Sequence, residues 1–169
     1  MSNGESPAMA NGSTPARTVE RCSTLEILPL RLSVLRDGTP SQNPRYDEDD
    51  LDGTVHFAVR DFDNDGEIIA TSTWLVRPWP QDSTAIAVQL RGMAVAKHCQ
   101  GRGLGGMLLA KGLLHARELG ATYVWARARD SAIDFYERHE FSVVGAEFID
   151  ESSGVSHHLV VHSLTRYKV

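Results

Sequence analysis

The chain has 169 residues and a mass of 18.6 kDa, with 41% apolar and 23% charged residues, which is the size and composition of one folded domain. Its net charge of −5 has the wrong sign for a surface that binds nucleic-acid phosphates, so a nucleic-acid partner is disfavoured. The two cysteines, Cys22 and Cys99, build no disulfide framework and show no metal-ligand spacing, which favours a reducing compartment. Because the sequence contains neither a long apolar run nor the pattern of a secretory signal, we expect a cytoplasmic protein with no membrane partner.

The first third of the chain is predicted to contain a tail, one helix and a loop. Residues 1–16 are rich in Ser, Asn, Gly and Pro without a hydrophobic period, so we expect a flexible tail over 1–20 and a folded domain over 21–169. A short helix is predicted from Pro29 to Arg36, where an apolar run ends at Asp-Gly. The polar segment 38–53 is predicted to be a loop.

The rest of the chain shows the order of strands and helices that is typical of an α/β domain. Apolar residues alternate with other residues over 55–60, and 68–76 is a second run rich in strand-forming residues. We therefore predict a single domain with a mixed central β-sheet flanked by helices. Its further elements are strands over 85–95, 121–126, 141–148 and 155–164, and helices over 104–119 and 131–139, the second capped by Asp130 or Ser131.

The spacing Asp61-x-Asp63-x-Asp65-Gly66 reproduces the first half of a calcium-binding EF-hand loop. The twelfth position, which should be a bidentate Glu, is Ser72, and the flanking segments are predicted strands. The segment is therefore predicted to be the turn of a hairpin, and no metal site is expected.

A glycine-rich run, Gln100 to Gly106, connects a predicted strand to a predicted helix. Backbone amides and the positive end of a helix would converge there on a pyrophosphate, and glycines leave the approach open. The letters also satisfy the dinucleotide pattern GxGxxG, but the acidic residue expected at the end of the next strand is absent from 121–129. A Walker loop is excluded because no Gly-Lys-Ser/Thr follows, whereas a purely structural turn remains an alternative.

Two motifs together resemble the GNAT superfamily of N-acetyltransferases. RGMAV at 91–95 followed by QGRGLG at 100–105 is similar to its acyl-CoA motif, and AIDFYER at 132–138 is similar to a helix of the same superfamily. The resemblance extends over about Val55 to Leu164. This chain departs from the pattern at three positions, with Glu140 where Gly is usual, Arg127 where Asn is frequent, and Ser156 where a Pro often precedes the histidine.

The resemblance implies direct transfer of an acetyl group from acetyl-CoA, the cosubstrate, to a primary amine. It implies that Tyr136 contacts the cofactor and is the general acid that protonates the leaving thiolate, although a half-buried packing role is the alternative. The backbone of Met93 and Val95 is expected along the pantetheine. The pyrophosphate is expected on the loop residues Gln100, Gly101, Arg102, Gly103, Leu104, Gly105 and Gly106.

The general base is assigned to His157, with His56, His158 or a carboxylate acting through water as alternatives. If 155–164 is a strand, His157 and His158 point to opposite faces, and the spacing of His158 and His162 does not make a metal site. The acidic residues over 47–52 either attract a cationic amine or form a solvated loop.

Two other function classes remain open at this point. The first is a non-catalytic CoA-binding sensor or interaction domain, and the second is an NAD-dependent oxidoreductase. Specificity for the acceptor, a small molecule or a protein, is placed in the least patterned segments, 39–53 and 78–83, and a homodimer is left open.

Overall fold

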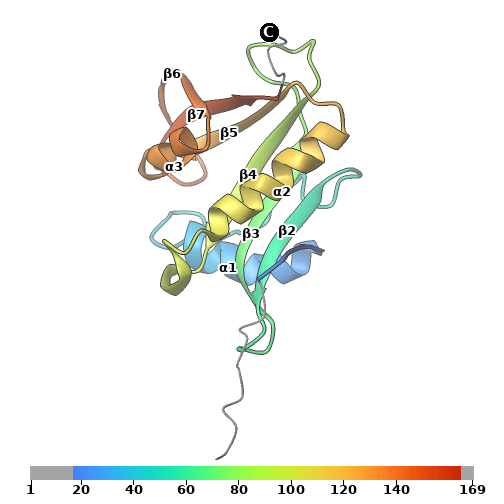
Figure 1. Ribbon diagram of the computed structural model, residues 1–169. Helices are drawn as coiled ribbons and strands as arrows, with labels where there is room; N and C mark the ends of the chain where they lie inside the picture. The colour runs from blue at the N-terminus through green and yellow to red at the C-terminus, as the bar shows by residue number, and fades with distance from the viewer. Residues whose placement is uncertain (1–16, 165–169) are drawn as a thin grey trace, which may run out of the picture.

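Seven strands form one mixed sheet in the order β1-β2-β3-β4-β5-β7-β6 in the computed structural model, which describes residues 17–164 (Figure 1). Three α-helices and two short 3-10 helices connect the strands. The elements are β1 (Val19–Cys22), α1 (Thr24–Leu35), β2 (Val55–Asp61), β3 (Glu67–Val76), β4 (Ala87–Val95), η1 (Lys97–Cys99), α2 (Leu104–Glu118), β5 (Tyr123–Arg129), η2 (Asp130–Ala132), α3 (Ile133–Arg138), β6 (Ser142–Ile149) and β7 (Ser156–Ser163).

The two central strands, β4 and β5, are paired along only part of their length. They are the one parallel pair in the sheet, and their register runs from Ala87 opposite Tyr123 to Leu90 opposite Ala126. Both strands continue past this point, and Figure 1 shows them diverging. Past the divergence β4 stays paired with β3 and β5 with β7, but the edges of β4 and β5 that face each other are unpaired, so a ligand can approach the sheet from within.

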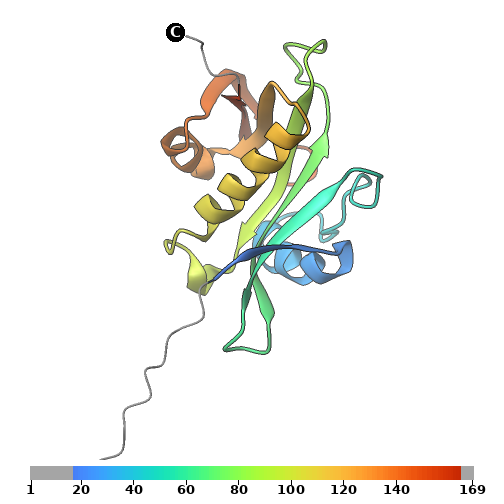
Figure 2. The same ribbon diagram turned by 45° about the vertical axis from the view of Figure 1, so that its right-hand side comes forward.

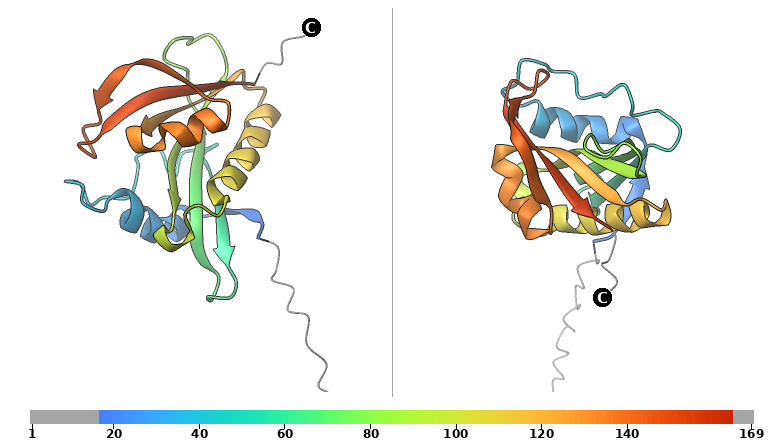
Figure 3. Two further views of the ribbon diagram at one scale, coloured as in Figure 1. Left: turned by 60° about the vertical axis from the view of Figure 1, so that its left-hand side comes forward. Right: turned by 90° about the horizontal axis from the view of Figure 1, so that it is seen from above.

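The helices cover both faces of the sheet. Seen from above, α1 and α2 lie on opposite sides of the strands (Figure 3, right), and α2 runs diagonally across β2, β3 and β4 (Figure 2). The main core lies between α2 and the sheet and contains the fully buried Trp74, Leu104, Leu108 and Leu109. The third helix, α3, contacts β5 and β6.

The predicted fold class and most predicted elements are confirmed. The observed β2, β3, β4, α2, β5, β6 and β7 all lie on the predicted segments, with ends that differ by a few residues. The hairpin turn is also confirmed, since Asp65 and Gly66 adopt φ of +52° and +72° and the Gly66 N–H donates to the Asp61 carbonyl at 2.9 Å. Within residues 17–164 no group of His, Cys, Asp and Glu is placed to hold a metal ion.

The N-terminal elements differ from the prediction in two ways. The helix predicted from Pro29 begins earlier, at Thr24, because the Glu26 carboxylate accepts hydrogen bonds of 2.7 Å from both the Ser23 N–H and its hydroxyl. Pro29 is tolerated inside the helix because the carbonyl it leaves free belongs to Leu25, which is 70% exposed. The strand β1 was not predicted, so pairing with β2 begins before the expected domain boundary at residue 21. The tail predicted over 1–16 lies outside the described residues.

Two details of the later helices also differ from the prediction. The helix predicted over 131–139 is a 3-10 turn followed by α3, and neither Asp130 nor Ser131 caps it, since its N-cap Ala132 makes no side-chain hydrogen bond. On α2, the apolar period over 104–119 predicts that Leu114 is buried, but Leu114 is 54% exposed and Gly112 is buried instead. The helices described between residues 17 and 164 are too short or too polar to span a membrane.

Candidate active site

A cavity of about 540 Å³ opens where β4 and β5 diverge. Its walls come from β4, β5, the end of α1, the start of α3 and the connection between β6 and β7. Both loops in which acceptor specificity was expected contribute to it, through Tyr46 from the first and through Pro78 and Pro80 from the second. The cavity therefore joins segments that are far apart in the sequence.

Tyr136 projects from α3 into this cavity. Its ring packs edge-on against Phe135 and Phe141, with centroids 5.3 and 5.2 Å away, so the side chain is held between the helix and β6. The residue is 6% exposed, and its hydroxyl has no hydrogen-bond partner among residues 17–164. Burial raises the pKa of the Tyr136 phenol above its ordinary value, so the phenol is protonated at neutral pH and is available as a donor.

His157 lies at the start of β7 and lines the same cavity. Its Nδ1 donates to the Val155 carbonyl at 2.8 Å, which leaves Nε2 of the neutral ring as the acceptor. The ring stacks on Phe148 with centroids 5.9 Å apart, and the residue is 7% exposed. The hydrogen bond and the stacking together hold one tautomer and one ring orientation.

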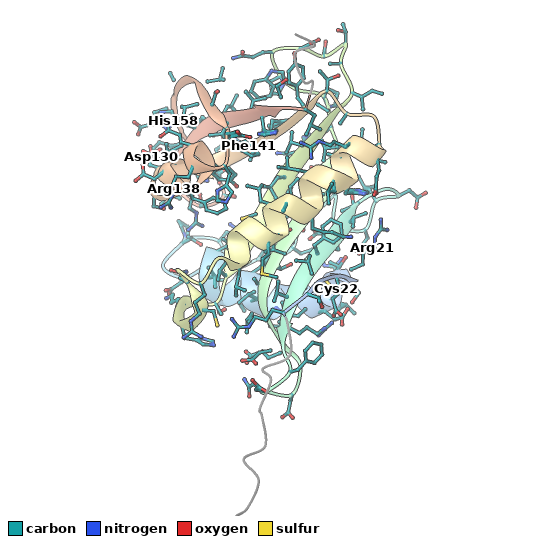
Figure 4. All side chains as sticks on the ribbon, viewed as in Figure 1. Arg21, Cys22, Asp130, Arg138, Phe141 and His158 are labelled. Carbon is teal, nitrogen blue, oxygen red and sulfur yellow. The ribbon has the colours of Figure 1, made fainter. Side chains whose placement is uncertain are left out.

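The other two histidines considered as the base do not line the cavity. His56 is buried in the core, where its Nε2 donates to the Asp49 carbonyl at 3.1 Å and its Nδ1 accepts from the Thr73 hydroxyl at 2.7 Å. His158 points to the opposite face of β7 and pairs with Asp130 at 2.9 Å, as Figure 4 shows beside α3. Of the three candidates, only His157 is brought into the cavity.

The glycine loop has the geometry that a close backbone approach requires. Gly101 and Gly103 adopt φ of +77° and +79°, and a Cβ on either residue would meet nothing within 4 Å. The first amides of α2, from Leu104 to Gly106, have no intrahelical acceptor, and no acidic residue lies in that turn. An anion could therefore be held there by backbone donors. Arg102 is exposed in the same loop.

The later glycines of the loop have a packing role that the sequence did not reveal. A Cβ on Gly105 would lie 3.1 Å from the Phe135 ring, and one on Gly106 would lie 3.1 Å from His139 Nε2. Both neighbours belong to α3 or the residue that follows it. The glycines therefore allow the helix that carries Tyr136 to approach the start of α2.

Of the other residues expected along the cofactor, Met93 lines the cavity, whereas Val95 and the loop from Gln100 to Gly106 lie outside its lining. The Gln100 side-chain amide donates to the Val95 carbonyl at 3.1 Å, which ties the loop back to the end of β4. Met93 and Gly92 form a β-bulge opposite Ser72, between the pairs Thr71 with Ala94 and Thr73 with Arg91.

Gly92 is a site residue that sequence reasoning missed. It has φ of +59°, and a Cβ there would lie 2.8 Å from Arg31 Nε and 3.0 Å from the Tyr46 ring. Arg31 is itself completely buried and forms a bidentate pair with Asp49, with distances of 2.7 and 3.0 Å. The glycine thus lets a buried ion pair pack directly under β4 at the bulge. A single Gly inside a predicted strand is the sequence signal that could have indicated this bulge and close approach.

The acidic loop is solvated in part, since Asp47, Asp50 and Asp52 are exposed, whereas Glu48 and Asp49 pair with arginines. Asp49 is 3% exposed in its pair with Arg31, so part of the loop is buried rather than solvated. Glu48 accepts from Arg77 at 3.0 Å and from Arg91 at 2.8 Å. The carboxylates at the cavity end of this loop are therefore compensated by arginines and are not free to attract a cationic amine.

Asp150, at the end of β6, is a second cavity residue that the sequence did not indicate. Burial raises the pKa of this carboxyl, but hydrogen bonds from the side chains of Ser152 and Ser153 and from the Ser153 amide, with Arg127 3.5 Å away, outweigh burial and lower it to about 2. The group is thus a carboxylate across the physiological pH range.

The family model described as "Acetyltransferase (GNAT) family" matches residues 25–141. This span contains both the glycine loop and Tyr136. The chain belongs to the GNAT acetyltransferase family. A search of curated proteins gives no match for it.

Solved structures show the same fold as this GNAT protein. An acyl-CoA N-acyltransferase from Pseudomonas aeruginosa is 20% identical with a TM-score of 0.69, and the match covers 88% of this chain and 100% of that one. A GNAT-family acetyltransferase from Staphylococcus aureus is 18% identical with a TM-score of 0.66, covering 89% and 100%. FeeM, an N-acyl amino acid synthase from uncultured soil microbes, is 12% identical with a TM-score of 0.68, covering 89% and 92%.

Membership of the GNAT family implies an acyl-CoA as cosubstrate and an acceptor for the acyl group. Glu140, which stands where relatives usually have Gly, adopts φ of +65°. The departure noted in the sequence therefore falls on a left-handed position, where a non-glycine residue is strained.

Proposed function

We propose that this protein transfers the acetyl group of acetyl-CoA directly to a primary amine. The observation that carries the proposal is that a free phenol, Tyr136, and an imidazole with an available Nε2, His157, line one cavity at the divergence of β4 and β5. A proton donor and a proton acceptor are the two groups that thioester aminolysis requires.

Acetyl-CoA fits the residues present at the cofactor side of the site. The backbone amides of the loop from Gly101 to Gly106 would hold its pyrophosphate, because Gly101 and Gly103 turn the chain with positive φ and no atom lies within 4 Å of a Cβ position on either residue. Around Met93, the edge of β4 that faces β5 has no partner strand, and its backbone groups are offered to the pantetheine. Acetyl-CoA supplies the activated acetyl group.

His157 is proposed to accept the proton that the acceptor loses. An alkylammonium has a pKa of about 10, so the attacking amine must be deprotonated before or during attack. Nε2 of His157 carries no proton in the neutral ring, because the hydrogen bond from Nδ1 to the Val155 carbonyl keeps the proton on Nδ1. A new C–N bond then forms at the thioester carbonyl as the C–S bond breaks.

Tyr136 is proposed to donate its phenolic hydrogen to the departing sulfur. Because burial raises the pKa of the phenol, the phenolate formed in this transfer is reprotonated at once by water, and the proton that His157 took from the amine is released to water. The products are an N-acetylated amine and free CoA.

Two measurements on the purified protein test this function. Acetyl-CoA should raise the melting temperature, and NAD should leave it unchanged, because only a ligand bound by the native state stabilises it. Amine-dependent release of free thiol should then follow on addition of an acceptor. Stabilisation by NAD, or no response to acetyl-CoA, would contradict the proposal.

The second candidate is a CoA-binding sensor without transferase activity. It is favoured because the glycine loop that would bind CoA is better defined than any site for an acceptor. It predicts the same stabilisation by acetyl-CoA with no thiol release above the spontaneous rate for any amine. Transfer to an amine that depends on His157 excludes it.

A further inference from the structure

The cavity is lined by five arginines and a single carboxylate. The carboxylate is Asp150, and the arginines come from the end of α1, from β5, from β4 and from the segment after β3. A site for an unmodified cationic amine would be expected to show the opposite balance of charge. The arginines are Arg36, Arg77, Arg91, Arg127 and Arg129.

Three of these arginines have carboxylate partners in the protein. Arg77 and Arg91 share Glu48, at 3.0 and 2.8 Å. Arg127 lies 3.5 Å from Asp150 and is 49% exposed. The positive charge of these three side chains is thus partly compensated before any ligand binds.

Arg36 and Arg129 have no carboxylate partner among residues 17–164. Arg36 Nε donates to the Asn43 carbonyl at 2.7 Å, and Arg129 Nη2 donates to the Leu35 carbonyl at 2.6 Å. Arg36 is only 5% exposed. A buried guanidinium that bonds only to backbone carbonyls keeps its full positive charge and is stabilised by an anion from elsewhere.

The two uncompensated arginines are neighbours in space although they are far apart in the chain. Arg129 bonds to the carbonyl of Leu35, the residue before Arg36, across a separation of 94 residues. Tyr46 supports this region, with Arg91 3.9 Å and Arg36 5.8 Å from its ring centroid. These contacts place Arg36, Arg91 and Arg129 on the side of the cavity that the end of α1 and Tyr46 form.

We propose, on the basis of the function above, that the acceptor is a small amine that also carries an anionic group, a carboxylate or a phosphate. Arg36 and Arg129 bind the anionic group through their planar guanidinium forks, which match both oxyanions. The amine then extends toward His157 in the same cavity. A volume of about 540 Å³ suits a small molecule of this kind.

The first experiment measures thiol release from acetyl-CoA with matched amines that differ in charge. The panel pairs α-amino acids with their amides, adds aminoalkyl phosphates such as O-phosphoethanolamine, and includes the polyamine spermidine. We expect kcat/KM for an acid to exceed that of its matched amide by about tenfold or more, as for a charge-assisted hydrogen bond. Preference for carboxylates or for phosphates then identifies the anionic group.

The second experiment uses the best acceptor with R36Q and R129Q. Each variant should raise the acceptor KM by about tenfold or more, because a neutral amide makes weaker bonds to an oxyanion. The Kd of acetyl-CoA, measured by calorimetry, should stay within about twofold of the wild-type value. The matched control is R117Q, which removes an exposed arginine near the end of α2 and should change neither constant.

The outcomes separate the acceptor proposal from the proposed function. Preference for amides or spermidine with normal acetyl-CoA binding overturns the anionic acceptor and leaves the transferase intact. Weaker acetyl-CoA binding in R36Q or R129Q with an unchanged acceptor KM also overturns it, since the arginines would then serve the cofactor phosphates. Binding of acetyl-CoA with no transfer to any amine overturns both.

Discussion

Gly112 in α2 and Trp74 in β3 are packed so closely that a Cβ on the glycine would lie 1.8 Å from Cζ2 of the indole. The indole is fully buried, and its Nε1 donates to the Ser72 hydroxyl at 2.8 Å, so it cannot move aside without losing that bond. The contact sets how closely the helix behind the glycine loop lies against the sheet.

Gly112→Ala should therefore destabilise the protein although alanine is the better helix former. We expect the free energy of unfolding in urea to fall by roughly 1–3 kcal/mol, the usual cost of overpacking, despite a gain of about 1 kcal/mol in helix propensity. The control K111A, at the adjacent exposed position, should stay within about 0.5 kcal/mol of the wild type. A stabilised Gly112→Ala variant would show that the helix and sheet are not in this contact.

Glu140→Gly should stabilise the protein, because Glu140 adopts φ of +65°. Relief of the left-handed strain should raise the free energy of unfolding by about 0.5–1 kcal/mol. The matched control is E137G within α3, which should lower it by roughly 1 kcal/mol since glycine is a poor helix former. Equal effects of the two substitutions would contradict the left-handed assignment.

Stability should fall as the pH is lowered below about 6.5. Burial lowers the pKa of His56 and of His115 below that of a free histidine, so the unfolded chain takes up protons that the native state does not. The stabilising contribution is complete above the unfolded pKa and is lost as the pH falls through the native one. H115Q should make the dependence of the unfolding free energy on pH less steep between pH 7 and 5. H98Q, which removes an exposed histidine, is the control and should keep the wild-type slope. An unchanged slope in H115Q would refute the assignment.

Gly103→Val should lower acetyl-CoA affinity by about tenfold or more, because a branched side chain would occupy the approach to the loop amides. Gly120 offers a matched control, since its φ of +71° is similar and a Cβ there also meets nothing within 4 Å. G120V should carry the same backbone strain and bind acetyl-CoA normally. Equal Kd values in calorimetry for the two variants would remove the loop from the cofactor site.

Tyr136→Phe should lower kcat by about 10- to 100-fold with a change of less than about threefold in either KM. Phenylalanine keeps the packing against Phe135 and Phe141, so the melting temperature should be retained. Tyr123→Phe, outside the main cavity, serves as the control for loss of a hydroxyl. Wild-type turnover in Tyr136→Phe would assign this residue a packing role alone.

The strands and the long helix were predictable because their signals are local. Alternation over 55–60 and the apolar period over 104–119 follow directly from strand and helix geometry. The start of α1 was missed because the apolar run was followed from Pro29, although Ser23 and Glu26 already formed a helix-start signal. The short β1 carries no pattern of its own and exists through its pairing with β2.

Among the candidate site residues, the structure places Tyr136 and His157 at the same cavity. The motif singled out Tyr136, whereas the strand alternation indicated only that His157 and His158 lie on opposite faces. Gly92, Asp150 and the buried Arg31–Asp49 pair were not indicated, because their roles depend on neighbours distant in sequence. The sequence predicts that the acidic loop over 47–52 is solvated or binds the substrate, because its pairing with arginines depends on residues distant in the chain.

The sequence by itself determined the α/β fold class, the glycine loop at the start of α2 and the resemblance to GNAT proteins, since each depends on residues close together in the chain. Only the tertiary structure decided which histidine faces the cavity and which charges remain uncompensated there. Arg36 and Arg129 become neighbours through a contact between segments 94 residues apart. No local pattern encodes that contact, because it forms where β4 and β5 diverge and the last residue of β5 reaches the end of α1.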